Sequence, residues 1–395
     1  MAVEFVAGNR LLLLNSNSEY VPALLRAITA ARCEIFLESY IFADDKTGRL
    51  VAARLAEAAQ RGVVVRVLVD GFGARDFERD FLTGFLEAGV QAMVYRPEVA
   101  RFRLRRHRLR RLHRKLVVID GIKAFVGGIN IIDDHNAPVG LGPRFDFAVQ
   151  VEGPVLAPIH ATVRRMWENV AWVNFRRRFR VSVTTLPSCG AVGEQLVAFL
   201  IRDNIRHRYD IANAYIEAIE AARREVIIAN AYFLPGIRFR RALVAAARRG
   251  VQVSVLLQGS TDHTLLRDAA RALYGTLIGS GVNIFEYVGG FLHAKVAVID
   301  GLWATVGSSN IDPMSLLLAK EANVVVQDQR FAETLREALL QAIAERAVHR
   351  LGDDLKKMPW YVRLRCWLSF AVVRSLIGLA GYDPAPWRSR IDDFD

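Results

Sequence analysis

The sequence of 395 residues contains little cysteine, and this scarcity excludes several classes of protein. The three cysteines, Cys33, Cys189 and Cys366, share no motif spacing, so neither a disulfide framework nor a zinc cluster is expected. No uncharged apolar stretch reaches about 18 residues, so no ordinary transmembrane helix is predicted. The N-terminus has no basic segment ahead of an apolar one, so we expect no signal peptide. The absence of a GxGxxG pattern argues against a dinucleotide-binding site.

Acidic residues are outnumbered by basic ones, 41 against 53, which gives a net charge of +12. A basic chain of this kind favours an anionic partner: a nucleic acid, an acidic membrane surface or a phosphate-bearing substrate. Eight arginines lie within residues 101–115, immediately around His113. A solvated basic loop is one interpretation. Because the run is contiguous with His113, we favour a collar that attracts an anionic headgroup or phosphate to the site.

Four sequence blocks occur twice and in the same order, which indicates an internal duplication. The matching pairs are 28–42 with 219–233, 60–73 with 248–261, 112–130 with 292–310, and 145–154 with 320–329. Continuous apolar segments alternate with segments of helical periodicity, a pattern typical of an α/β sheet covered on both faces. The expected fold is therefore two duplicated α/β halves related by a pseudo-two-fold axis, with one shared active site.

The expected organisation follows from this repeat. The first half spans residues 1–170 and a connection spans 171–200, where arginines and aromatic residues precede a turn. The second half spans 201–350, and an apolar tail containing arginine and tryptophan spans 351–395. Charge-free runs in the tail are too short to cross a bilayer. Tryptophan beside arginine suits a membrane interface, although a helix packed on the body of the protein is the plainer alternative.

The duplicated block at 112–130 and 292–310 contains the pattern His-x-Lys-x4-Asp, and this motif indicates phosphoryl-transfer chemistry. Histidine and lysine two residues apart share one face of a strand, so one phosphate can meet both. With two copies, one imidazole can attack phosphorus while the other protonates the leaving oxygen. The candidate catalytic residues are His113, Lys115, Asp120, His293, Lys295 and Asp300.

Other polar residues near the motifs complete the expected site. Asn130, Asn310 and Ser308 are predicted to bind the substrate phosphate, together with the two lysines. Asp146 and Glu321 occupy equivalent places in the repeat, and we expect each to hold a histidine in one tautomer. Asp120 and Asp300 are expected to fix the lysine or the loop rather than to touch phosphorus. Glu38 and Asn230 end equivalent strands and are possible cleft residues, or strand-end groups bonded to backbone.

These motifs resemble the paired HKD motifs of the phospholipase D superfamily, and the resemblance covers nearly the whole chain. Within that superfamily the chain is most similar to bacterial cardiolipin synthases of the B type, on the residues LHRKLVVID, VGGIN and ATVGSSNIDPMSLLLAKEANV. The resemblance implies a two-half α/β fold, ping-pong phosphatidyl transfer, and His113 as the nucleophile with His293 as acid/base. Met314 and Ala319 depart from the pattern of many relatives, which bears on substrate preference.

The predicted function is phosphatidyl transfer between two phosphatidylglycerol molecules, with a phosphohistidine intermediate and release of glycerol. A phospholipase D that hands the same intermediate to water remains open, as does a phosphodiesterase acting on nucleic acid, although the apolar tail argues against nucleic acid as a partner. A non-catalytic membrane-binding protein would leave the duplicated motif unexplained. No metal and no cofactor are expected, because two ammonium groups can stabilise the phosphate charge. We expect peripheral association with the inner membrane at its cytoplasmic face.

Overall fold

The computed structural model describes residues 3–97, 110–175, 179, 190–203, 206–260, 264–312 and 319–379. Within these ranges no helix is both long enough and apolar enough to span a membrane. No group of three or more His, Cys, Asp or Glu side chains in the same ranges is arranged to hold a metal ion.

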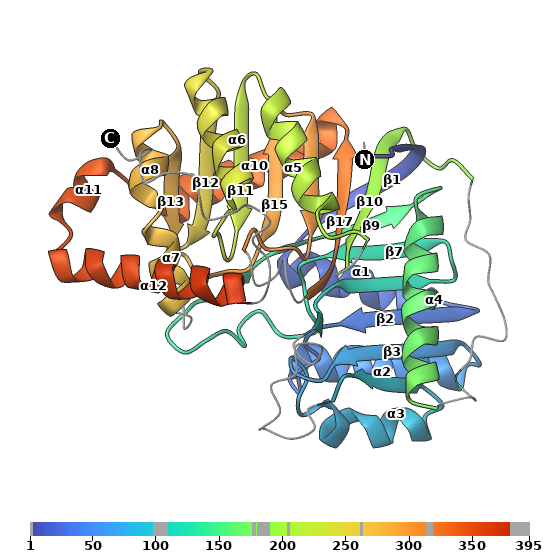
Figure 1. The fold of residues 1–395 in the computed structure, drawn as a ribbon. Coiled ribbons are helices and arrows are strands. Elements are labelled where there is room, and N and C mark those ends of the chain that lie inside the picture. Colours follow the sequence, from blue (N-terminus) through green and yellow to red (C-terminus); the bar gives the residue numbers. More distant parts are fainter. Residues whose placement is uncertain are drawn as a thin grey trace.

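The first half alternates strands and helices as the repeat predicts (Figure 1). Its elements are β1 (Val6–Asn15), α1 (Ser16–Ala30), β2 (Glu34–Ser39), α2 (Lys46–Gln60), β3 (Val64–Asp70), the π-helical turn η1 (Glu78–Leu82), α3 (Thr83–Glu87), β4 (Gln91–Tyr95), β5 (Arg111–Leu112), β6 (Lys115–Ile119), β7 (Lys123–Gly127), β8 (Arg144–Phe145), β9 (Phe147–Glu152) and α4 (Leu156–Val173).

The second half repeats this order and adds elements at its end. They are β10 (Gln195–Arg202), α5 (Asp210–Ala221), β11 (Glu225–Asn230), α6 (Ile237–Arg248), β12 (Gln252–Gln258), α7 (Thr264–Arg271), α8 (Tyr274–Gly279), β13 (Asn283–Tyr287), β14 (Phe291–Leu292), β15 (Lys295–Ile299), β16 (Trp303–Gly307), β17 (Ala319–Gln327), α10 (Gln329–Arg346), β18 (Ala347–Arg350), α11 (Gly352–Lys357) and α12 (Trp360–Leu379).

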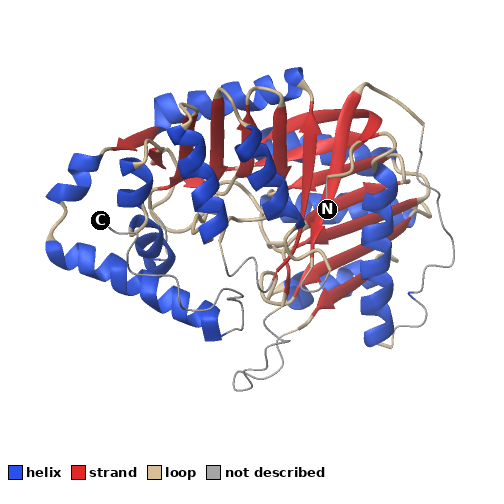
Figure 2. Ribbon diagram, turned by 45° about the horizontal axis from the view of Figure 1, so that its top comes forward, coloured by secondary structure: helices blue, strands red, loops and turns tan. Residues whose placement is uncertain are grey.

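The sheet order is the same when it is followed outward from the centre into either half. The central strands β1 and β10 pair antiparallel. The order β1-β9-β7-β6-β2-β3-β4 on one side matches β10-β17-β16-β15-β11-β12-β13 on the other, and β18 extends the second side. Helices cover both faces of this sheet (Figure 2), which explains why most of its strands are continuous apolar runs. The topology confirms the predicted pair of duplicated α/β halves.

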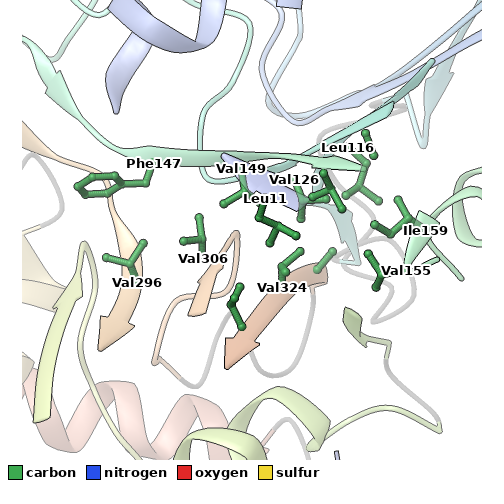
Figure 3. Packing of buried hydrophobic residues seen from close by; sticks show 14 of the residues in the cluster. Leu11, Leu116, Val126, Phe147, Val149, Val155, Ile159, Val296, Val306 and Val324 are labelled. Atoms are coloured by element: carbon green, nitrogen blue, oxygen red, sulfur yellow. The ribbon is translucent and has the colours of Figure 1, made fainter. Parts of the chain in front are cut away.

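Three hydrophobic clusters hold this arrangement together. One lies within the first half under α1 and α2, and one lies within the second half under α5 and α6. The third is shared: Leu116, Val126 and Phe147 of the first half pack in the same cluster as Val296 and Val324 of the second (Figure 3). Because this buried core crosses the boundary, the two halves form one body, and the ends of β6 and β15 are held in a fixed relation.

Parts of the expected organisation overlap with regular structure. Helix α4 continues to Val173 and β10 begins at Gln195, so both run into the connection predicted at 171–200. Residues 176–178 and 180–189 of that connection lie outside the described residues, as do residues 380–395 of the tail and residues 101–109 of the arginine-rich run. The described part of the tail consists of α11 and α12.

Candidate active site

Each motif histidine follows a two-residue strand that pairs with the other half. Strand β5 pairs in parallel with the start of β17, and β14 pairs in parallel with β8. The amide of His113 donates to the carbonyl of Lys320 at 3.0 Å, and the amide of His293 donates to the carbonyl of Phe145 at 2.9 Å. The residue after each of these carbonyls is an acid, Glu321 or Asp146. The short strands therefore bring each histidine beside a carboxylate of the opposite half.

The side chains complete this crossed arrangement. Nδ1 of His113 lies 3.0 and 3.1 Å from the two carboxylate oxygens of Glu321. Nδ1 of His293 lies 2.6 Å from Oδ2 of Asp146. A carboxylate at Nδ1 keeps the proton on that nitrogen and leaves Nε2 with its lone pair, as a nucleophile or base requires. The sequence predicted Asp146 and Glu321 as orienting residues, but the exchange between halves emerges only from the structure.

The motif lysines are buried next to the histidines. Nζ of Lys115 donates to the carbonyl of His113 at 2.5 Å, and Nζ of Lys295 donates to the carbonyl of His293. Burial lowers the pKa of Lys115 to about 7 and that of Lys295 to about 8, and each is also influenced by the acids of the site. Their positive charges act on each other and on both histidines, so the four side chains form one electrostatic unit.

Both imidazoles favour the neutral form. Burial lowers the pKa of His113, an effect that Glu321 opposes and Lys115 reinforces. Burial lowers the pKa of His293 well below its usual value, and the positive charges of Lys295 and Arg144 lower it further. Neutral imidazole is the form that can attack phosphorus, so the site is prepared for nucleophilic chemistry near pH 7.

The two orienting acids differ in their protonation. Burial raises the pKa of Asp146 to about 6, although Lys295 and the amide of Phe147 counteract it. Burial also acts to raise the pKa of Glu321, but His113 and Arg202 outweigh that effect and the pKa lies below its usual value. Glu321 therefore stays ionised to lower pH than Asp146, and Asp146 is the acid that can hold a proton near neutral pH.

Glu321 is supported by residues from β10 and the segment after β16. Oγ of Ser308 donates to Oε2 of Glu321 at 2.5 Å and accepts from the amide of Ala322 at 3.1 Å. Arg202 donates to Oγ of Ser309 at 3.2 Å and has its other terminal nitrogen 3.7 Å from Oε1 of Glu321. Ser308 was predicted to bind phosphate. The structure instead places it behind the carboxylate with no exposed surface.

The equivalent position in the first half is Gly128, and its lack of a side chain serves Asp146. A Cβ atom added at Gly128 would fall 2.3 Å from Oδ1 of Asp146. The glycine thus leaves room for the Asp146 carboxylate, whereas the serine of the second half fills the same room and bonds to Glu321. The GG and GS pairs in the two motifs therefore shape the orienting acids.

The asparagines partly engage the backbone between strands. Oδ1 of Asn130 accepts from the amide of Ile41 at 3.0 Å, and Oδ1 of Asn230 accepts from the amide of Ile311 at 3.1 Å. Oδ1 of Asn310 and Nδ2 of Asn230 are buried without a hydrogen-bond partner among the described residues. Asn230 thus shows the backbone-bonded arrangement considered as its alternative, and substrate binding by Asn130 and Asn310 stays a prediction.

Glu38 is not brought to the histidines. Both of its oxygens are held by Arg114, at 2.5 Å from Nε and 2.9 Å from Nη2, and Arg114 also donates to the carbonyl of Thr162 in α4. Because Arg114 lies between His113 and Lys115 in an extended segment, its side chain leaves from the opposite face. The structure therefore places Glu38 in a buried ion pair with Arg114 against α4, and not in the cleft where it was expected.

The motif aspartates lie at the far ends of the strands. Asp120 follows β6 and accepts from the amides of Arg32, Cys33 and Glu34 at 2.7–2.8 Å, and Asp300 does the same for residues 223–225. Five strand residues separate each from its histidine's end of the strand, a distance of about 16 Å. Both have positive φ, 51° and 54°. They clamp the loop before β2 or β11, one of the two roles expected for them, and do not reach the phosphate position.

Sequence reasoning missed three residues around the histidines. The ring of Tyr40 lies 4.7 Å from that of His113 and 5.4 Å from Nζ of Lys115. Arg202 supports Glu321, and Arg144 stands over the ring of Phe291 and lowers the pKa of His293. Tyr40 lies in a block that is repeated, and Arg144 directly precedes a repeated block, so the repeat offered a signal for both. Arg202 has no equivalent arginine in the first half.

Comparison with known proteins agrees with this geometry. The family model described as "Cardiolipin synthase, PLD-like domain" matches residues 24–141 and 215–343, one segment in each half. The chain belongs to the cardiolipin synthase family. It is 40% identical over 388 residues to cardiolipin synthase B of Escherichia coli (strain K12), covering 96% of this chain and 91% of that protein. It is 31% identical over 366 residues to cardiolipin synthase A of Yersinia pseudotuberculosis serotype O:1b (strain IP 31758), covering 91% and 74% respectively.

A solved structure supports the fold at lower sequence similarity. The phosphatidylserine synthase of Haemophilus influenzae Rd KW20 superposes with a TM-score of 0.69 at 13% identity, over 96% of this chain and 97% of that one. Together with the family match, this confirms the predicted phospholipase D-like architecture. The family also confirms that the chain is an enzyme of the cardiolipin synthase-type phosphatidyltransferase class, as the paired motifs predicted.

Proposed function

We propose that this enzyme moves a phosphatidyl group from one phosphatidylglycerol to another through a phosphohistidine at His113, and releases glycerol. The observation that carries the proposal is the crossed pair of histidine–carboxylate contacts, 3.0 Å for His113 and 2.6 Å for His293. This arrangement supplies two oriented imidazoles to one phosphorus atom, which is what a double displacement requires.

In the first half-reaction, Nε2 of His113 attacks the phosphorus of the donor and the bond to the glycerol headgroup oxygen breaks. In this step Asp146 starts protonated, and neutral His293 carries its own proton on Nε2. The departing oxygen takes the Nε2 proton while the Asp146 proton moves to Nδ1, so His293 stays neutral and Asp146 becomes a carboxylate. The ammonium groups of Lys115 and Lys295 stabilise the negative charge on the non-bridging oxygens. The products of this step are free glycerol and a phosphatidyl group bonded to His113.

In the second half-reaction, the headgroup hydroxyl of another phosphatidylglycerol loses its proton to His293 and attacks the same phosphorus. The bond to Nε2 of His113 breaks, and His113 returns to its neutral form. Cardiolipin leaves, and the enzyme has the proton count with which it started. The overall reaction converts two phosphatidylglycerol molecules into one cardiolipin and one glycerol, with no other reactant.

The difference between the two acids supports this assignment of roles. Phosphorylated His113 keeps its proton on Nδ1 and carries positive charge, so it gains from the firmly ionised Glu321. His293 must donate and accept protons, so it gains from Asp146, whose pKa is about 6. Family resemblance independently favours His113 as the nucleophile.

The proposed setting is the cytoplasmic face of the inner membrane, with the enzyme bound peripherally, because both substrates lie in a bilayer. The direct test is to incubate the purified protein with vesicles of phosphatidylglycerol carrying a labelled headgroup. Cardiolipin and labelled glycerol in equal amounts support the proposal. Phosphatidic acid as the main product would assign the enzyme to hydrolysis instead, and no product at all would refute both.

A further inference from the structure

Helix α12 has two apolar faces, and the part of the chain that the structure describes covers only one of them. Cys366 and Val373 are buried on the face toward α7, and Val373 belongs to the core of the second half. Trp360, Leu364, Trp367, Leu368 and Val372 are exposed large apolar side chains. Their spacing of 0, 4, 7, 8 and 12 residues places them on one stripe of the helix. A contiguous exposed stripe of this kind marks an interaction surface.

Arginines border this stripe on both sides. At about 100° per residue, Arg363 lies along one edge of the exposed face and Arg365 along the other. Arg365 contacts Asp268 of α7 at 2.8 Å, which fixes that edge to the body of the protein. Burial lowers the pKa of Arg240 in α6, and the charges of Arg374 in α12 and of Arg241 lower it further, so Arg374 adds positive charge near this end of α6.

A cavity of about 460 Å³ opens beside the same helix. Its walls are largely apolar and include Ile278, Met358 and Cys366, while Lys356 and Arg363 supply positive charge. Trp367 lines this cavity and also belongs to the exposed stripe. Cationic groups beside apolar walls suit an anionic phospholipid, whose phosphate and chain need both.

The position of α12 relates this surface to the active site. Helix α12 packs along α7 (Figures 1 and 2), and α7 follows the carboxyl end of β12. Gln258 at that end of β12 accepts from the amide of Leu292, the residue before His293. The exposed stripe therefore belongs to the edge of the second half that also carries His293.

We propose that the exposed face of α12, bordered by Arg363 and Arg365, docks the enzyme on a lipid bilayer that contains anionic phospholipid. The docking proposal rests on the proposed function in one respect: docking is useful because it brings the active site to its lipid substrate. The occupant follows from charge. Arg365 is paired with Asp268, but two copies of this face against each other would oppose their Arg363 side chains, whereas an anionic bilayer neutralises that charge. Tryptophan and arginine side chains both suit the boundary between headgroups and acyl chains.

The test compares two variants of the full-length protein. The docking variant is Leu364→Gln, Trp367→Gln and Leu368→Gln, all at exposed positions. The control is Ile122→Gln with Leu302→Gln. These residues lie in the β6–β7 and β15–β16 turns, at the strand ends far from the histidines, and their side chains are 55% and 54% exposed, close to the 55% of Leu368. Each protein is sedimented with vesicles of phosphatidylcholine alone or with phosphatidylglycerol, and its transfer activity is measured on phosphatidylglycerol dispersed in detergent.

The docking variant should partition onto anionic vesicles at least ~30-fold more weakly than wild type, because interfacial affinity scales with buried apolar area. Its activity in detergent should match wild type, and the control should bind like wild type. Wild-type binding should weaken without phosphatidylglycerol and at high salt. Wild-type binding without turnover in either assay would support docking and refute the proposed function.

Two results would overturn the docking proposal. One is unchanged sedimentation of the docking variant with anionic vesicles. The other is a wild-type oligomer in solution that the same three substitutions convert to monomer, which would make this face a contact between copies of the chain. Sedimentation equilibrium on both proteins, without lipid, measures that second outcome.

Discussion

Replacing Glu321 by glutamine should stop the nucleophilic step while leaving the fold intact. Ser308 donates to one oxygen of Glu321, so the glutamine oxygen will occupy that side and its NH2 group will face Nδ1 of His113. An NH2 group there cannot accept the Nδ1 proton, and a neutral amide no longer stabilises the positive charge of phosphorylated His113. The tautomer with its proton on Nε2, the atom that must attack, therefore becomes more populated. We expect the rate of the first step to fall about 10³- to 10⁴-fold, or about 4–5.5 kcal/mol in the barrier.

The matched variant is Asp146→Asn, which should affect His293 instead. A donor with a weakly basic leaving group, phosphatidyl-p-nitrophenol, needs no proton from the acid and separates the two roles. With this donor, Asp146→Asn and His293→Ala should still release a burst of p-nitrophenolate. Glu321→Gln and His113→Ala should not. Rapid-mixing absorbance measures the burst directly.

The crossed contacts are tested by which acid variant behaves like which histidine variant. If each acid served the histidine of its own half, Asp146→Asn would behave like His113→Ala and Glu321→Gln like His293→Ala. That result would refute the exchange between halves. Equal bursts from all four variants would show that neither carboxylate controls its histidine.

Three further outcomes follow from the site. The value of kcat/KM should rise with pH up to the lowered pKa of His113, as its imidazole becomes neutral. It should fall above about pH 6, as the Asp146–His293 pair loses the proton that it gives to the leaving oxygen, and fall further above about pH 7–8, as Lys115 and Lys295 lose the charge that stabilises phosphate. A flat profile from pH 5 to 9 would contradict these assignments. Gly128→Ala should lower kcat with little change in Tm, because its Cβ would displace the Asp146 carboxylate, and wild-type turnover would contradict this. Asp120→Ala should lower the free energy of unfolding, measured by urea titration, by about 2 kcal/mol, because three backbone amides lose their acceptor. The variant should keep its kcat. A selective loss of kcat would instead give Asp120 a catalytic role.

The sequence predicted the larger features of the fold because duplication is visible in residue order. Apolar runs alternating with helical segments indicated two α/β halves, and the paired motifs indicated one site. The same pattern could not show that β5 pairs with β17 and β14 with β8, because two-residue strands have no periodicity to detect. These short strand pairs place Glu321 beside His113 of the other half, and Asp146 beside His293 of the other half.

Individual site residues were harder to predict because a side chain's direction depends on its partners. Glu38 ends a strand as a cleft residue would, yet Arg114 holds both of its oxygens on the other face of the sheet. Ser308 sits in the motif segment, but its hydroxyl is engaged by Glu321. The sequence of the tail suited both a membrane interface and a helix packed on the body, because α12 is apolar on two faces, one packed on α7 and one exposed.

The most direct test of the mechanism is to trap the covalent intermediate and find which residue carries it. Wild-type enzyme is mixed with phosphatidylglycerol, quenched in alkali during the first turnover, digested and mapped by mass spectrometry. We predict a phosphatidyl group on the peptide that contains His113, present in the wild type and absent from Glu321→Gln. An adduct on the peptide that contains His293, or cardiolipin formed during that turnover with no adduct, would contradict the proposed mechanism.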